Sequence, residues 1–79
     1  MPTGNIMAYS IPEGAEVFVD GTSPLTRFGT ARTPAMIPEV FAGMHNVTFR
    51  LSGYFDETKP VNVPQGGYST VYAVLLPAK

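Results

Sequence analysis

The sequence predicts an all-β domain, built as a small sandwich or a partly closed barrel. Apolar and polar residues alternate with a period of two along most of the chain, as in strands that bury one face. Turn residues interrupt this alternation roughly every 8 to 12 positions. No window shows the three- and four-residue apolar spacing of an amphipathic helix with caps. About six to seven short strands are therefore expected to pack in two layers.

Each expected strand is a run of alternating residues bounded by glycine, proline or polar residues. The strands cover residues 5–11, 15–20, 35–40, 44–52, 54–63 and 68–76. In strand 44–52, one phase is predicted to face the core. This phase consists of His45, Val47, Phe49 and Leu51. Pro38 and Pro60 lack the N–H group that a central strand needs, so their strands are expected at sheet edges or bulges.

Two segments have the composition of hairpin turns. Pro12-Glu13-Gly14 combines a fixed proline φ with a glycine that can adopt the left-handed conformation, which predicts a hairpin corner between the first two strands. Residues 64–67, Pro-Gln-Gly-Gly, predict the last hairpin turn because a glycine pair accepts positive φ.

Composition limits both the size of the domain and its partners. The 79 residues form one domain, 1–79, with a thin core, and the absence of cysteine leaves strand pairing and apolar packing to stabilise it. A net charge of −1 without a basic cluster argues against nucleic acid as a partner. The chain has no charged leader followed by an apolar core, and no apolar run of about 18 residues, so neither a signal peptide nor direct membrane insertion is predicted.

Several short motifs follow one another in a specific order along almost the whole chain. They are Pro12-Glu13-Gly14-Ala15, Asp20-Gly21, Thr33-Pro34, Gly43-Met44-His45-Asn46-Val47 and Gly53-Tyr54. This series resembles the PEGA domain, a small β module of archaeal and bacterial envelope proteins. One departure is the link 22–32, which looks longer than the usual link of the family.

The resemblance implies a transthyretin-like or immunoglobulin-like β-sandwich without catalytic activity. It also implies an extracellular, cell-wall or surface-layer setting, in tandem with or beside other domains. On this basis the chain is interpreted as a domain excised from a longer envelope protein, with Met1 supplied for expression.

No catalytic or metal-binding constellation is visible, so neither an enzyme nor a cofactor site is expected. His45 is the only histidine, no partner for it can be identified, and its place on the inward phase predicts a packed, hydrogen-bonded side chain. Asp56 and Glu57 are neighbours on an expected strand, so their carboxylates point apart. Asp20 is expected to bond the backbone of its own turn.

The long link 22–32 is the best candidate for a ligand-binding loop. It contains Arg27, Phe28 and Arg32, and an aromatic ring beside arginines suits carbohydrate or an acidic polymer. The alternative, which we favour, is that Phe28 covers the open end of the sandwich while the arginines stay in water.

The outward phase of the outer strands is unusually apolar, with Tyr9, Phe18 and Tyr72 as its aromatic members. If these side chains share one exposed face, they predict an interface with a neighbouring domain or an identical copy. A sandwich that covers these strands on both sides is the alternative.

Asn46-Val47-Thr48 matches an N-glycosylation acceptor, and the strand alternation turns Asn46 outward. Such tripeptides also arise by chance, and an unmodified Asn46 is the simpler expectation.

Two functional hypotheses remain. The first is a noncatalytic structural or interaction module of a cell-envelope protein. The second is a module that binds cell-wall or surface polysaccharide through loop 22–32 and exposed tyrosines.

Overall fold

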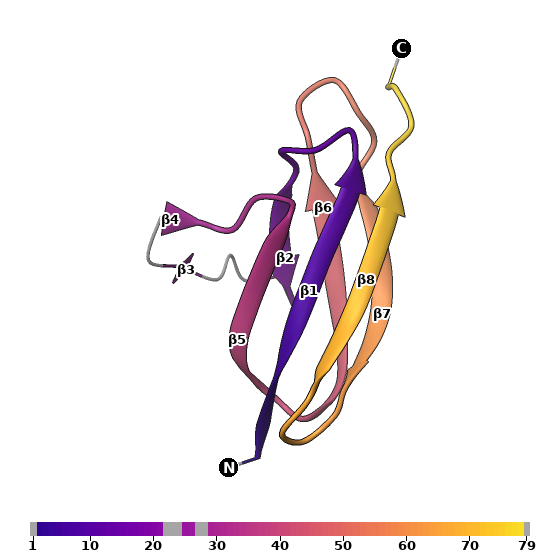
Figure 1. Ribbon diagram of the computed structural model, residues 1–79. Coiled ribbons are helices and arrows are strands. Elements are labelled where there is room, and N and C mark those ends of the chain that lie inside the picture. Colours follow the sequence, from indigo (N-terminus) through magenta and orange to yellow (C-terminus); the bar gives the residue numbers. More distant parts are fainter. Residues whose placement is uncertain (1, 22–24, 27–28, 79) are drawn as a thin grey trace.

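The chain folds into two packed three-stranded sheets, which confirms the predicted all-β sandwich (Figure 1). The computed structural model describes residues 2–21, 25–26 and 29–78. The six main strands are β1 (Thr3–Ile11), β2 (Glu16–Val19), β5 (Ala35–Phe41), β6 (Gly43–Arg50), β7 (Glu57–Val63) and β8 (Tyr68–Val74). Two short strands, β3 (Leu25–Thr26) and β4 (Gly29–Thr30), pair with each other beside the sandwich.

The strand orders are β5-β1-β8 in one sheet and β2-β6-β7 in the other. All pairs within the sheets are antiparallel except β1 and β8, which run parallel. The sandwich is therefore mostly antiparallel, and its first and last main strands lie side by side.

The period-two pattern of the sequence decides which side chains enter the core. Alternate residues of β1 are buried, and Val47 and Phe49 of β6 are fully enclosed, as their phase predicts. The core is the set of apolar side chains buried between the sheets. It comprises Ile6, Ala8, Ala15, Val17, Ala31, Ile37, Val40, Val47, Phe49, Val61, Val63, Val71, Ala73 and Leu75.

The strand after β6 starts later than predicted, at Glu57 rather than residue 54. Residues 51–56 leave the sheet in a turn, where the Tyr54 N–H donates to the Leu51 carbonyl. Tyr54 then pairs with Pro77 near the end of the chain. This pairing draws the segment toward the C-terminal tail and away from the β6–β7 ladder.

Both prolines lie in edge strands, as predicted. Pro38 belongs to β5, and Asn5 of β1 lies opposite a bulge that contains Pro38 and Glu39, whose φ is +60°. Pro60 belongs to β7, the outer strand of the other sheet. Neither strand needs the missing proline donor on its free side.

The prediction of a hairpin at Pro12–Gly14 is wrong. Gly14 does adopt positive φ, at +95°, but β1 and β2 lie in different sheets, so this segment is an arch across the sandwich. The turn at residues 64–67 is likewise a crossing, from β7 in one sheet to β8 in the other. Turn residues dictate a reversal of the chain, but the partners of the flanking strands are set by long-range packing.

The crossing at residues 64–67 folds tightly over the start of β1. The Gly66 N–H donates to the Thr3 carbonyl, and the Asn5 N–H donates to the Gly67 carbonyl, both at 2.9 Å. Gly4 lies between these bonds, and a Cβ there would overlap the Pro64 carbonyl oxygen and come within 2.8 Å of Val63 Cγ1. Only glycine permits this approach.

Gly4→Ala is expected to destabilise the fold by about 3 kcal/mol, because the backbone of β1 or of the crossing must shift. Urea unfolding would measure this loss. Thr3→Ala is the neighbouring control, with an expected cost below about 1 kcal/mol. Equal midpoints for the two variants would contradict the close approach.

Candidate functional site

The two family motifs Pro12–Ala15 and Thr33-Pro34 form one hydrogen-bonded unit at the end of the sandwich. Thr33 Oγ1 accepts hydrogen bonds from the N–H groups of Gly14 at 3.1 Å and Ala15 at 3.0 Å. Two main-chain hydrogen bonds reinforce this contact. The Gly14 N–H donates to the Thr33 carbonyl, and the Thr33 N–H donates to the Ala15 carbonyl, both at 2.9 Å. The arch is thus attached to the segment that leads into β5.

A second hydroxyl extends this unit into the core. Ser10 Oγ lies 2.6 Å from Thr33 Oγ1 and donates to the Pro12 carbonyl at 2.8 Å. Because the Ser10 proton is used there, the Thr33 hydroxyl donates to Ser10 Oγ. Ser10 and Thr33 are the buried polar residues of the described chain, only 3% and 4% exposed, and both hydroxyls are hydrogen-bonded. We call these contacts the Ser10–Thr33 network.

The predicted ligand loop is only partly described, since Arg27 and Phe28 lie outside the described residues. Arg32 is exposed, and its Nη1 donates to the Gly14 carbonyl at 3.2 Å. Arg32 therefore contacts the outside of the arch.

Asp20 bonds residues of β6, and residues 22–24 of its own turn lie outside the described residues, so the bond predicted within that turn stays a prediction. Its φ is +51°, and Oδ1 accepts the Asn46 N–H at 2.9 Å while the Asp20 N–H donates to the Asn46 carbonyl at 2.8 Å. Its other oxygen, Oδ2, lies 2.5 Å from His45 Nδ1. The carboxylate thus joins the end of β2 to the start of β6.

His45 therefore has the carboxylate partner that sequence reasoning did not find. Its Nε2 lies 2.6 Å from the carbonyl oxygen of Phe41, which can only accept. Both ring nitrogens donate in this arrangement, so the imidazolium form fits it best. The hydrogen bond to Asp20 raises the pKa of His45, with a further contribution from the Phe41 carbonyl. The hydrogen bond from the Asn46 N–H is the main cause that lowers the pKa of Asp20, and the hydrogen bond with His45 is the second. The predicted hydrogen bonding of His45 is confirmed, and neither ring nitrogen is free to act as a base. The prediction that His45 faces the core is wrong, because its side chain is 14% exposed and does not belong to the buried core.

Asp56 and Glu57 have different basic partners. Asp56 receives hydrogen bonds from Nε and Nη2 of Arg50, which hold the pKa of its carboxyl below the usual value. Glu57 Oε2 lies 3.4 Å from Nζ of Lys59. Among the described residues, no group of three or more metal-ligating side chains comes together.

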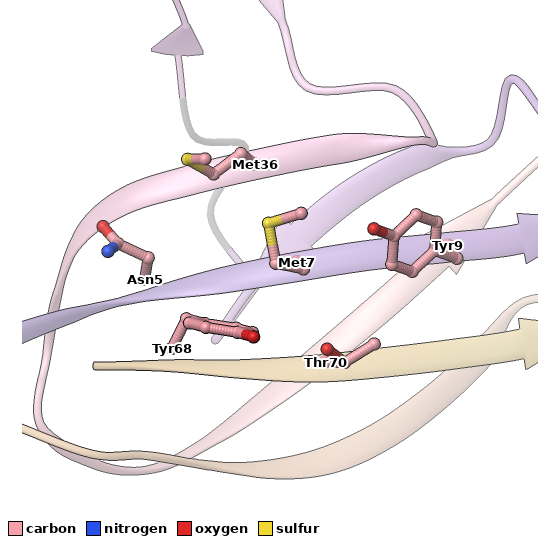
Figure 2. Close-up of a pocket in the computed structure, with 6 residues that line it drawn as sticks. All are labelled: Asn5, Met7, Tyr9, Met36, Tyr68 and Thr70. Carbon is pink, nitrogen blue, oxygen red and sulfur yellow. The ribbon is translucent and has the colours of Figure 1, made fainter.

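The outer surface of sheet β5-β1-β8 carries uncharged side chains on its central and flanking strands (Figure 2). It contains a shallow depression of about 350 Å³. Six residues line this depression: Asn5, Met7, Tyr9, Met36, Tyr68 and Thr70. None is charged, and Met36 and Tyr68 are 57% and 66% exposed. We call this surface the uncharged face.

The predicted aromatic interface divides between two surfaces. Tyr9 and Tyr72 are paired neighbours on β1 and β8. Phe18 belongs to β2 in the other sheet, where the Arg50 guanidinium lies 5.3 Å from the centre of its ring. The three side chains cannot share one surface, because the chain changes sheet between β1 and β2. Met36 and Tyr68 complete the uncharged face instead, and their membership depends on strand order, which the alternation does not reveal.

The remaining motif residues lie at turns. Gly21 follows β2, Gly43 opens β6, and Gly53 precedes Tyr54, all three glycines with positive φ. The Gly53 carbonyl accepts the Ala78 N–H, and the half-buried Tyr54 packs against the core. Asn46 is exposed as predicted, which glycosylation requires, and its modification stays a prediction.

A family model described as PEGA domain matches residues 3–79, essentially the whole chain. A search of curated proteins found no match. Among the described residues, no helix is long and apolar enough to span a membrane.

Thr33→Val is expected to lower the free energy of unfolding by about 2–3 kcal/mol. Valine keeps the branched shape but leaves the buried Ala15 N–H without its bond to Oγ1. Thr58→Val is the matched control, because the Thr58 hydroxyl bonds Thr48 at the surface, and it is expected to cost less than about 0.5 kcal/mol. Urea unfolding that gives equal losses would contradict the role of the Ser10–Thr33 network.

The His45–Asp20 pair is expected to stabilise the fold most between the unfolded-state pKa values of the two groups, 3.8 for Asp20 and 6.5 for His45. The raised pKa of His45 gives stability below 6.5 that is lost as pH rises through the folded value. The lowered pKa of Asp20 gives stability above 3.8 that is lost as pH falls through its folded value.

NMR titration of the single imidazole checks this pair. Asp20→Asn is expected to shift the His45 pKa downward and to flatten the loss of stability above pH 6.5. Asp56→Asn, which removes a carboxylate paired with Arg50, is the control. An unchanged imidazole titration in Asp20→Asn would refute the pairing.

Proposed function

Because the chain belongs to the PEGA domain family, whose members are small extracellular or surface modules, we propose that it is a noncatalytic interaction module of a cell-envelope or surface-layer protein. Its uncharged face packs against a neighbouring domain or another envelope component. The observation that carries this proposal is the contrast between the outer surfaces of the two sheets.

The uncharged face presents large apolar side chains to water. Ile11, Met36, Tyr68, Tyr72 and Val74 are each 52% or more exposed. Monomeric domains seldom expose contiguous apolar patches beyond a few hundred Å² without a partner. Covering the depression would release water from apolar surface, and none of its six lining side chains is charged.

The opposite outer surface has the composition of a solvated face. Arg50 pairs with Asp56 there and covers Phe18, and Glu16 on β2 lies near the same guanidinium. Charged pairs of this kind are costly to desolvate. The binding preference of the module is therefore assigned to the β5-β1-β8 sheet.

The noncatalytic assignment is supported by the state of the titratable groups. Both nitrogens of His45 are hydrogen-bonded, and Asp20, Asp56 and Glu57 each have a basic partner. General acid–base catalysis needs a group that is free to exchange a proton with substrate.

Polysaccharide binding is the second candidate, and the depression favours it over the partly described loop. The exposed Tyr68 ring lies beside Asn5 and Thr70, which supply polar groups next to an aromatic surface (Figure 2). Sugar rings bind to such combinations by stacking and hydrogen bonding.

Cysteine labelling tests the packing role, because the chain has no cysteine of its own. Asn5→Cys places a thiol on the central strand of the uncharged face, and Thr48→Cys places one on the central strand of the opposite surface. In the purified chain both react with a maleimide. In the envelope of the source cells, Asn5→Cys is expected to react about tenfold more slowly than Thr48→Cys, because its face is covered.

Equal reaction of the two thiols in the envelope would contradict packing through the uncharged face. Addition of purified envelope polysaccharide to the purified chain separates the two candidates. If polysaccharide, with no other envelope component present, slows the reaction of the Asn5→Cys thiol with maleimide, carbohydrate binding is favoured over packing against a protein.

A further inference from the structure

Three of the four outer edges of the two sheets are protected against pairing with another strand. On β5, Pro38 lacks an N–H group, and the bulge that contains Pro38 and Glu39 interrupts the regular edge. On β7, Pro60 lies opposite Asn46, whose backbone groups bond to Asp20. The Pro60 ring therefore replaces a donor at the free side of β7.

The third edge, β2, is covered by the chain itself. The Val17 N–H donates to the Ala31 carbonyl at 3.0 Å, and Glu16 forms a bridge with Arg32. The segment that approaches β5 thus occupies the hydrogen-bonding positions of β2.

The edge of β8 has none of these devices. The strand is seven residues long, Tyr-Ser-Thr-Val-Tyr-Ala-Val, without proline, charge or bulge. In Figure 1 it forms the border of its sheet, next to β1 alone. Natural proteins seldom leave such an edge open unless it has a partner.

Two backbone hydrogen bonds establish which groups of β8 point outward. The Asn5 N–H donates to the Gly67 carbonyl, and the Leu75 N–H donates to the Ile11 carbonyl. Because bonding alternates along a parallel ladder, the odd-numbered residues of β8 face β1. The N–H and C=O groups of the even-numbered residues therefore face the free edge. These residues are Tyr68, Thr70, Tyr72 and Val74. Within the described part of the chain, the N–H and C=O groups of these four residues form no backbone hydrogen bond with a turn, a loop or another segment outside the strand ladders.

We infer that the β8 edge binds the β8 edge of a second copy of this chain in an antiparallel, two-fold arrangement. The even-numbered positions specify one register that satisfies all of them, with Val71 on the axis. Thr70 then lies opposite Tyr72 of the other copy, and Tyr68 opposite Val74. These facing pairs are the hydrogen-bonded pairs of the ladder, in which the two residues exchange both N–H···O bonds.

A second copy suits this edge better than an unrelated strand because the pairing is self-complementary. Two-fold pairing places a strand against its own copy. A charged residue near the axis would therefore lie beside the same charge on the other copy. β8 has no charged residue, and its facing pairs are apolar or aromatic with threonine. The result is one continuous sheet, β5-β1-β8-β8-β1-β5, whose uncharged faces adjoin.

This inference rests on the proposed interaction role and names one partner for it. The edge uses backbone groups of β8, whereas the packing test uses a side chain of the central strand β1. Failure of edge pairing is therefore distinguishable from failure of face packing.

Sedimentation equilibrium of the purified chain over a wide concentration range tests the edge. Dimers are expected, and Thr70→Pro is expected to raise their dissociation constant at least about tenfold, because proline removes an outward donor and leaves the β1 ladder intact. Thr58→Pro is the matched control, since Thr58 lies two residues from Pro60 and faces the free side of β7. It is expected to leave dimerisation unchanged, and circular dichroism checks that both variants fold.

Disulfide trapping tests the register without proline. Residues opposite each other in a hydrogen-bonded pair have Cα atoms about 5.5 Å apart, within reach of a disulfide. A mixture of Thr70→Cys and Tyr72→Cys chains is expected to form an oxidised dimer that contains one chain of each kind. Neither variant alone is expected to trap as efficiently.

A chain that stays monomeric at the highest concentration would overturn the inference, as would dimers that Thr70→Pro does not weaken. Dimers trapped equally well by Thr70→Cys alone would overturn the proposed register. If the purified chain is monomeric and the Asn5→Cys thiol is nevertheless protected in the envelope, face packing is supported and edge pairing is rejected.

Discussion

The structure depends on the Thr33 hydroxyl, which joins strands of both sheets at one end of the sandwich. It accepts two N–H groups of the arch that connects β1 to β2, and it donates to Ser10 at the end of β1. Two residues later the chain enters β5, where Ala35 pairs with Ala8 of β1. A small domain without disulfides has few other means of holding two sheets in register. A buried, fully satisfied polar network supplies this specificity because its alternatives leave groups unpaired.

The Asp20–His45 pair performs a similar task with charge. It ties the end of β2 to the start of β6, and the Phe41 carbonyl adds the end of β5. The two networks differ in their response to pH. Hydroxyls do not titrate in the physiological range, whereas the imidazole does. A change of pH therefore weakens or strengthens the His45 contacts and leaves the Ser10–Thr33 network unchanged. The motif residues Asp20 and His45 thus have a structural role, because their bonds join β2, β6 and the end of β5.

The sequence alone predicted what depends on local pattern. Period-two alternation placed Val47 and Phe49 in the core, and the missing N–H groups of Pro38 and Pro60 placed their strands at edges or bulges. It could not assign strands to sheets, because the same proline and glycine chemistry suits a hairpin and an arch. The separation of Phe18 from Tyr9 and the pairing of Asp20 with His45 both follow from that assignment. Each is a contact between residues distant in sequence, for which local pattern carries no signal.

The meaning of an uncharged final strand also depends on topology. A run such as Tyr68–Val74 would be an ordinary central strand if it were paired on both sides, and its composition is typical of one. The parallel pairing with β1 leaves it at the border of its sheet, so its outward N–H and C=O groups retain the capacity to bond. Because the other sheet edges carry proline, a bulge or a covering segment, pairing through β8 consumes the open edge. Such pairing ends at two copies instead of continuing into a fibre, so the domain can associate without aggregating.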